Sequence, residues 1–186
     1  MSKSGSGLFK GTLGSTYSNS SSNEPSYTDR GIDIPEKIKT ALSALKNKGD
    51  YFSTQNGEFF MKDISIMSKE TGVEFAVVST GNDSFIIRGD TRGTDIPNSI
   101  LNRIRTSGGT LNYHSHPLND DCIPSKSDRD VMRTLRRITG QKTSTIVTPN
   151  GRTTVFDEHG VIETGTISNL IDKNSREIYL KLFGGK

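Results

Sequence analysis

The amino-acid sequence predicts an α/β (α+β) domain in which a mixed β-sheet is flanked by helices. Runs with apolar residues three and four positions apart, typical of helices, alternate with short runs rich in Val, Ile and Phe. Two pairs of strand-like runs are separated by Gly81-Asn82-Asp83 and by Pro149-Asn150-Gly151, which is typical of hairpins. Helices between strands, together with hairpins, indicate a sheet with both parallel and antiparallel pairs.

Turn residues and apolar spacing define the elements in order. A helix starts near Pro35 and stops before Gly49, and another ends near Gly72. The predicted helices occupy residues 34–45, 60–71, 96–107, 125–139 and 170–182, and the predicted strands occupy residues 73–79, 84–88, 110–116, 143–148 and 153–157. Leu111 and Tyr113 alternate with polar neighbours, which places both on one face of their strand.

The first 31 residues differ in composition from the rest of the chain. They are rich in Ser, Gly, Asn and Thr, so we expect residues 1–31 to be a disordered Gly/Ser-rich linker. Residues 32–186 are long enough for one domain with its own core. The single cysteine, Cys122, excludes an internal disulfide. We expect its thiol to be partly buried in a loop; the alternatives are an adventitious fourth metal ligand and a redox-active thiol.

Composition also narrows the classes of partner and location. The formal net charge of +3 favours acidic partners without selecting nucleic acid over an acidic protein surface. No apolar run reaches the length of a membrane span, and the first residues are unlike a secretory signal. The sequence therefore predicts a protein with no membrane partner and without nucleic acid as its expected partner. The protein is expected to be cytoplasmic, or to be secreted or injected as an effector.

The residues that point most specifically to chemistry are two histidines and an aspartate. His114 and His116 are separated by one residue on a predicted strand, so both imidazoles project from the same face. Pro117 ends the strand, and Asp128 lies in the first turn of a helix that begins at Ser125. Two imidazoles and one carboxylate suit Zn²⁺ and leave a fourth position for water, as in catalytic zinc sites. The alternative for Ser125 and Asp128 is a helix-capping pair.

The pattern His114-x-His116-Pro117, followed by Ser125-x-x-Asp128, resembles the signature of the JAMM (MPN-type, JAB domain) zinc metalloprotease family. The resemblance implies a cytidine-deaminase-like fold and zinc bound by His114, His116 and Asp128. It also implies that the Ser125 hydroxyl helps to stabilise the oxyanion. Eleven residues separate His116 from Asp128, one more than is usual in that family.

The resemblance further implies a glutamate, on an earlier strand, that activates a zinc-bound water. Glu74 is the first choice because it enters the strand at residues 73–79. Glu70, expected in the connection between helix and strand, is the second choice, and Glu58 is less well placed. The alternative for Glu74 is a solvated residue at a strand edge.

The implied function is that of a zinc-dependent peptidase or isopeptidase, similar to deubiquitinases, that acts on protein or peptide substrates, including ubiquitin-like ones. Gly7-Leu-Phe-Lys-Gly-Thr-Leu-Gly14 resembles the lead-in of bacterial polymorphic-toxin and phage-protein effector domains, which implies a delivered toxin with a cognate inhibitor or delivery protein. The alternative for this segment is plain linker. One alternative function is a metal-dependent phosphoesterase or nuclease, because residues 129–137 include four arginines. Another is a non-catalytic MPN-type protein-binding scaffold.

Overall fold

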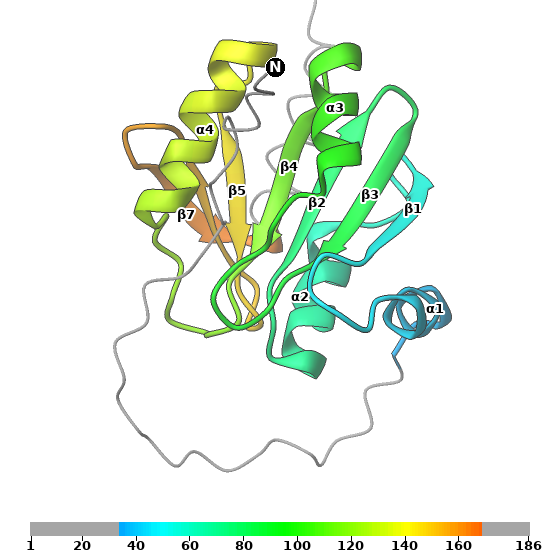
Figure 1. The fold of residues 1–186 in the computed structure, drawn as a ribbon. Coiled ribbons are helices and arrows are strands. Elements are labelled where there is room, and N and C mark those ends of the chain that lie inside the picture. The colour runs from blue at the N-terminus through cyan, green and yellow to red at the C-terminus, as the bar shows by residue number, and fades with distance from the viewer. Residues whose placement is uncertain (1–33, 169–186) are drawn as a thin grey trace, which may run out of the picture.

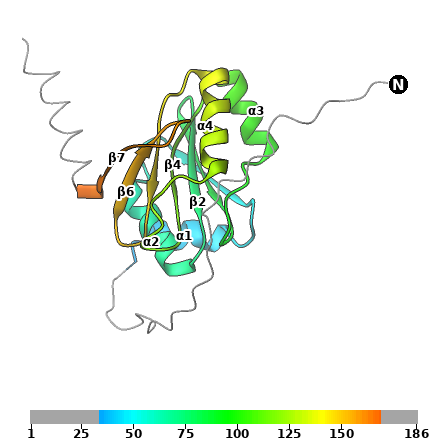
Figure 2. The ribbon, with the colours of Figure 1, turned by 90° about the vertical axis from the view of Figure 1, so that its left-hand side faces the viewer.

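A computed structural model of the chain describes residues 34–168, which form one seven-stranded sheet with helices on both faces (Figures 1 and 2). The helices are α1 (Glu36–Ala44), α2 (Met61–Thr71), α3 (Asn98–Ser107) and α4 (Lys126–Thr139). The strands are β1 (Tyr51–Gln55), β2 (Phe75–Thr80), β3 (Asp83–Arg88), β4 (Thr110–Ser115), β5 (Ser144–Val147), β6 (Arg152–Phe156) and β7 (Val161–Thr166).

The sheet is mixed, as the sequence predicts. Its strand order is β1-β3-β2-β4-β5-β6-β7, and every neighbouring pair is antiparallel except β4 and β5, which run parallel. The connection between these two parallel strands is α4, because parallel neighbours need a crossover. The mixed α/β fold class is therefore confirmed.

The predicted elements within residues 34–168 are all present, and two strands were not predicted. These are β1 and β7, the two edges of the sheet. Helix α4 ends where expected, at Gly140, whose positive φ of 77° favours glycine. The predicted linker at residues 1–31 and the predicted helix at 170–182 lie outside the described residues. Of the helices within 34–168, none is both long and apolar enough to cross a membrane.

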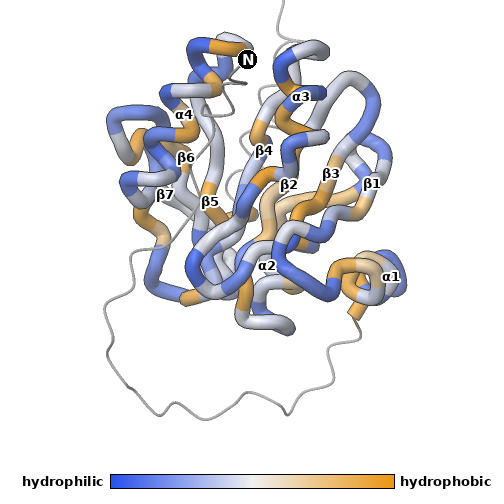
Figure 3. The backbone as a smooth tube through the Cα atoms, viewed as in Figure 1, coloured by the Kyte–Doolittle hydropathy of each residue, from blue (hydrophilic) through white to orange (hydrophobic). Residues whose placement is uncertain are grey.

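Two hydrophobic clusters lie on opposite faces of the sheet. One contains Ile104 of α3, Leu135 of α4 and the strand residues that face these helices. The other contains Ile38 of α1, Ile64 of α2 and the strand residues on the opposite face. Hydrophobic stretches run along the central strands, and several of the connecting loops are hydrophilic (Figure 3).

A β-bulge in β4 decides which residues face α4. The register of β4 against β2 shifts between Leu111 and Tyr113, so Asn112 is an extra residue. Leu111 consequently belongs to the cluster under α3 and α4, whereas Tyr113 packs on the side of α1 and α2. The prediction that Leu111 and Tyr113 share a face is therefore wrong, because it assumed unbroken alternation. Asn112 is held in the bulge by donating to Ser79 Oγ at 2.6 Å.

Candidate metal centre

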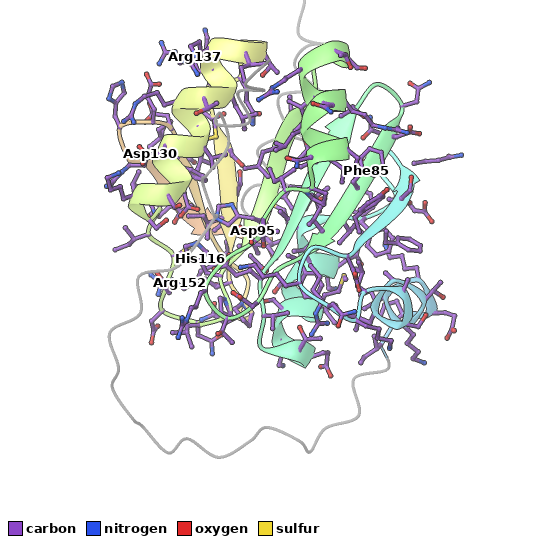
Figure 4. All side chains as sticks on the ribbon, viewed as in Figure 1. Phe85, Asp95, His116, Asp130, Arg137 and Arg152 are labelled. Atoms are coloured by element: carbon purple, nitrogen blue, oxygen red, sulfur yellow. The ribbon has the colours of Figure 1, made fainter. Side chains whose placement is uncertain are left out.

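Three predicted ligands converge at the end of the sheet where α4 begins. His114 lies in β4, His116 follows that strand, and Asp128 is in the first turn of α4. All three side chains are fully buried. Each offers one ligand atom, and these atoms lie within 4.8 Å of one another. Figure 4 shows His116 toward this end of the sheet.

The distances between the ligand atoms are short. His114 Nε2 is 3.3 Å from Asp128 Oδ1, and His116 Nε2 is 3.6 Å from Asp128 Oδ2. The two Nε2 atoms are 3.2 Å apart. Two nitrogen donors and a carboxylate oxygen therefore face one another in a buried space, so the group can hold a metal ion.

Asp128 also caps its own helix, which combines the two interpretations of the sequence. The Ser125 N–H donates to Asp128 Oδ2 at 2.7 Å, and the Asp128 N–H donates to Ser125 Oγ at 3.2 Å. This reciprocal pair is a capping box. It fixes the carboxylate against the helix start and leaves Oδ1 directed toward His114. The capping contacts thus orient the carboxylate, as outer contacts orient metal ligands.

Glu74, the first-choice base, lies on the same face as the histidines. Ala76 pairs with His114 in the antiparallel β2–β4 ladder, so the same register places Glu74 opposite His116. Directly opposed residues project from the same face of a sheet and lie close together. Glu74 is fully buried, and its negative charge contributes to a raised pKa of His116. Glu74 is therefore not a solvated residue at a strand edge.

The other two glutamates lie away from the cluster. Glu70 is exposed in the last turn of α2, a helix that packs on the opposite face of the sheet, and not in a connection as predicted. Glu58 is exposed before α2, where its carboxylate accepts a hydrogen bond from Thr54. Of the three candidates, Glu74 alone is buried on the face that carries the ligands.

The site titrates as a coupled group. Burial lowers the pKa of both histidines, but hydrogen bonds from His116 to Asp121 and Asp128, with the Glu74 charge, outweigh it and raise the pKa of His116 to about 10. For His114, burial dominates and its pKa is lowered. Burial raises the pKa of Asp128, yet the two histidines hold it well below its usual range. The raised pKa of His116 favours its protonated form in the absence of a metal ion, and a bound cation would compete with that proton.

The loop after β3, which contains Gly89 and Thr94, packs beside the buried Glu74. Gly89 donates its N–H to Glu74 O at 2.8 Å and continues the β2–β3 register opposite Glu74. A Cβ added at Gly89 would lie 2.5 Å from Oγ1 of Thr94, which is fully buried. Thr94 Oγ1 therefore fills the space on the site face beside Glu74, and it has no hydrogen-bond partner among residues 34–168. No sequence signal marked Thr94.

Cys122 has a packing role. Its thiol is buried in the cluster under α4 and accepts a hydrogen bond from Thr154 Oγ1 at 3.0 Å. Cys122 does not belong to the group of possible metal ligands, so the structure supports the expected buried thiol. The residue beside it, Asp121, contacts His116 and was not singled out by the sequence.

Comparison of the chain with known protein families, with curated proteins and with solved structures finds no match.

Proposed function

We propose that the protein is a zinc-dependent peptidase or isopeptidase whose metal is held by His114, His116 and Asp128. The observation that carries this proposal is the convergence of the three buried ligands on the sheet face that also carries the buried Glu74. Two imidazoles and one carboxylate leave a fourth position open at zinc, as hydrolytic zinc enzymes require. The resemblance to the JAMM signature points to the same reaction.

Each residue has a role that its surroundings support. Zinc, when bound, supplies a Lewis acid that lowers the pKa of a coordinated water from 15.7 toward about 7. The Glu74 carboxylate accepts the proton of the attacking water and passes it to the leaving amine. Ser125 Oγ accepts from the Asp128 N–H, so its own proton remains available to donate to the oxyanion. Loss of one such donor typically costs about 2.7–4 kcal/mol of barrier.

The proposed substrate is a protein or peptide, including ubiquitin-like proteins. Only residues 140–143 connect α4 to β5, which leaves no room there for a long substrate-gripping insertion. We therefore expect little selectivity for one ubiquitin linkage. We also propose that the chain is a delivered effector with a cognate inhibitor, which follows from the resemblance at residues 7–14.

The arginines of α4 give the phosphoesterase alternative less support. Arg133 binds Asp130 at 2.6 Å, and Arg136 binds Glu158 at 2.7 Å, so two of the four positive charges are already compensated. In Figure 4 Asp130 and Arg137 lie along α4, away from His116. The metal cluster contains two histidines, fewer than sites of that class usually use.

Metal analysis combined with hydrolysis assays tests the proposal. The purified protein should contain one zinc per chain, and His114→Ala should lose it. A panel of fluorogenic peptides and ubiquitin conjugates should be cleaved by the zinc-loaded protein. Glu74→Gln should keep the zinc and lose turnover, because the amide cannot accept a proton.

Each contrary result identifies a different error. Absence of stoichiometric zinc would favour a scaffold. Hydrolysis of phosphate esters in place of amides would favour the phosphoesterase alternative. Full turnover by Glu74→Gln with zinc bound would show that another group is the base.

A further inference from the structure

The loop between the ligands contacts the metal cluster from behind. His116 Nδ1 lies 2.9 Å from the backbone carbonyl oxygen of Asp121. The same nitrogen lies 3.5 Å from Oδ1 of the Asp121 side chain. Both atoms are acceptors, so the arrangement requires a proton on His116 Nδ1. The lone pair of the neutral ring is then on Nε2, the atom that faces Asp128.

One oxygen of the Asp121 carboxylate is buried without a hydrogen bond to the described part of the chain, which is energetically unfavourable. Its side chain is 14% exposed, and Oδ2 is buried without a hydrogen-bond partner among the described residues. Within residues 34–168 the one cationic side chain found within 4.0 Å of this carboxylate is His116. A carboxylate oxygen buried without a hydrogen bond is unfavourable unless a nearby group of opposite charge compensates it. The imidazole beside it is that group.

The loop that carries Asp121 is anchored to the core next to this residue. Its neighbour Cys122 is buried in the core and bonded to Thr154 of β6. The Asp121 N–H contacts Leu118 O at 3.4 Å within the same loop. The loop is thus attached to the core through Cys122 and to His116 through the Asp121 carbonyl oxygen, and both contacts favour the position of Asp121 beside the imidazole.

His114 lacks a comparable contact. Its Nδ1 has no hydrogen-bond partner among residues 34–168. The ring is instead packed edge-to-face against Phe156, with centroids 5.8 Å apart. One histidine is thus oriented by packing and the other by hydrogen bonding, so the carboxylate of Asp121 acts on a single ligand.

We propose that Asp121 is a positioning residue of the metal centre, which selects the Nδ1–H form of His116 and makes its Nε2 a stronger ligand. This inference rests on the metal-binding part of the proposed function. The Asp121 backbone carbonyl accepts the Nδ1–H at 2.9 Å, and the carboxylate adds its negative charge 3.5 Å from the same nitrogen. Mutation of such outer partners of a ligating histidine typically changes metal affinity by about 10–100-fold. The loop that separates the ligands thereby contributes to the site and is more than a spacer.

Zinc dissociation constants, measured by competition with a chromogenic chelator, test this role in the purified full chain. Asp121→Asn keeps the size of the side chain and removes its charge, and it should weaken zinc binding by about 10–100-fold. Asp120→Asn is the matched control because it removes the same charge one residue away, where the side chain is 99% exposed. Asp120→Asn should bind zinc as the wild type does.

A second measurement does not depend on a variant. Nitrogen-15 spectra of the histidine side chains in the zinc-loaded wild type should show His116 protonated at Nδ1. An Nε2–H form would overturn the inference, and so would an Asp121→Asn affinity equal to that of the wild type. A lower melting temperature of Asp121→Asn with unchanged zinc affinity would also overturn it, because it would show a purely structural role. If the wild type bound no zinc, the proposed function itself would fail.

Discussion

One substitution can separate the two roles of Asp128, the helix cap seen in the structure and the proposed metal ligand. In Asp128→Asn the side-chain carbonyl still accepts the Ser125 N–H, and the backbone N–H still donates to Ser125 Oγ. The capping box is therefore kept. The substitution removes the negative charge that faces the two histidines, and with it the only anionic ligand of the group.

The expected magnitude follows from binding linkage. Zinc at 100 times its dissociation constant stabilises the folded protein by about 2.7 kcal/mol. In a domain the size of residues 34–168 this corresponds to a rise of roughly 10 °C in melting temperature. If the loss of the Asp128 carboxylate weakens binding about 100-fold, the same zinc concentration gives about 0.4 kcal/mol and a shift near 1–2 °C.

Thermal unfolding with zinc and with a chelator measures this difference. The zinc-induced shift is compared within each variant, because Asp128→Asn also loses the pairing of Asp128 with His114 and His116 and starts from a less stable metal-free form. We expect the shift to fall from roughly 10 °C to about 1–2 °C in Asp128→Asn and to remain near roughly 10 °C in Ser125→Ala. If Asp128→Asn kept the full shift, Asp128 would be a cap and not a ligand.

Three further outcomes are expected. Ser125→Ala removes the acceptor of the Asp128 N–H and should lower the free energy of unfolding by about 1 kcal/mol in urea titrations; an unchanged midpoint would contradict the capping role. Gly89→Ala would bring a Cβ to 2.5 Å from Thr94 Oγ1, so we expect a loss of about 1–3 kcal/mol in the same assay, and a stability equal to wild type would show that the loop yields. Because the pKa of His116 is raised to about 10, the metal-free ring is protonated at neutral pH. Zinc binding should therefore release a proton, and the zinc affinity should rise with pH up to a pH of about 10. Calorimetry in buffers of different ionisation enthalpy measures this proton release. A binding heat that does not depend on the buffer would contradict the prediction.

The helices and strands that the sequence predicts are those whose apolar side chains pack in one of the two hydrophobic clusters. Helix α4 and strands β2 and β3 bury one or two faces, so their apolar spacing is visible in the sequence. Strand β7 has no buried residue, and β1 alternates between exposed and half-buried positions. In β1 only Phe52 packs against the cluster under α1 and α2, so five residues with one side chain in that cluster gave too weak a signal to predict the strand. Strand β7 buries no side chain and has no apolar face to detect.

Some residues of the candidate site can be predicted from neighbouring positions in the sequence, and others depend on contacts between distant segments. Strand alternation predicts that His114 and His116 share a face, and the resemblance to the JAMM signature adds Asp128 as their expected partner, whereas spacing alone also allowed Asp128 to be only a helix cap. The proximity of Glu74 to His116 depends on the register between β2 and β4, which spacing along the chain does not fix. Asp121 and Thr94 depend on how two loops fold back, and neither residue type has a distinctive pattern there.

The bulge at Asn112 reconciles two requirements of β4. Leu111 must be buried under α3 and α4, and Tyr113 must reach the opposite side, where its hydroxyl donates to Phe59 O at 2.6 Å. Strict alternation would place these two side chains on one face and His114 on the other. With one extra residue, Leu111 and His114 both face α4, the helix that carries Asp128. Bulges are common next to active sites because they redirect a side chain in this way. The irregularity that the apolar pattern missed is thus what brings the histidines to the aspartate.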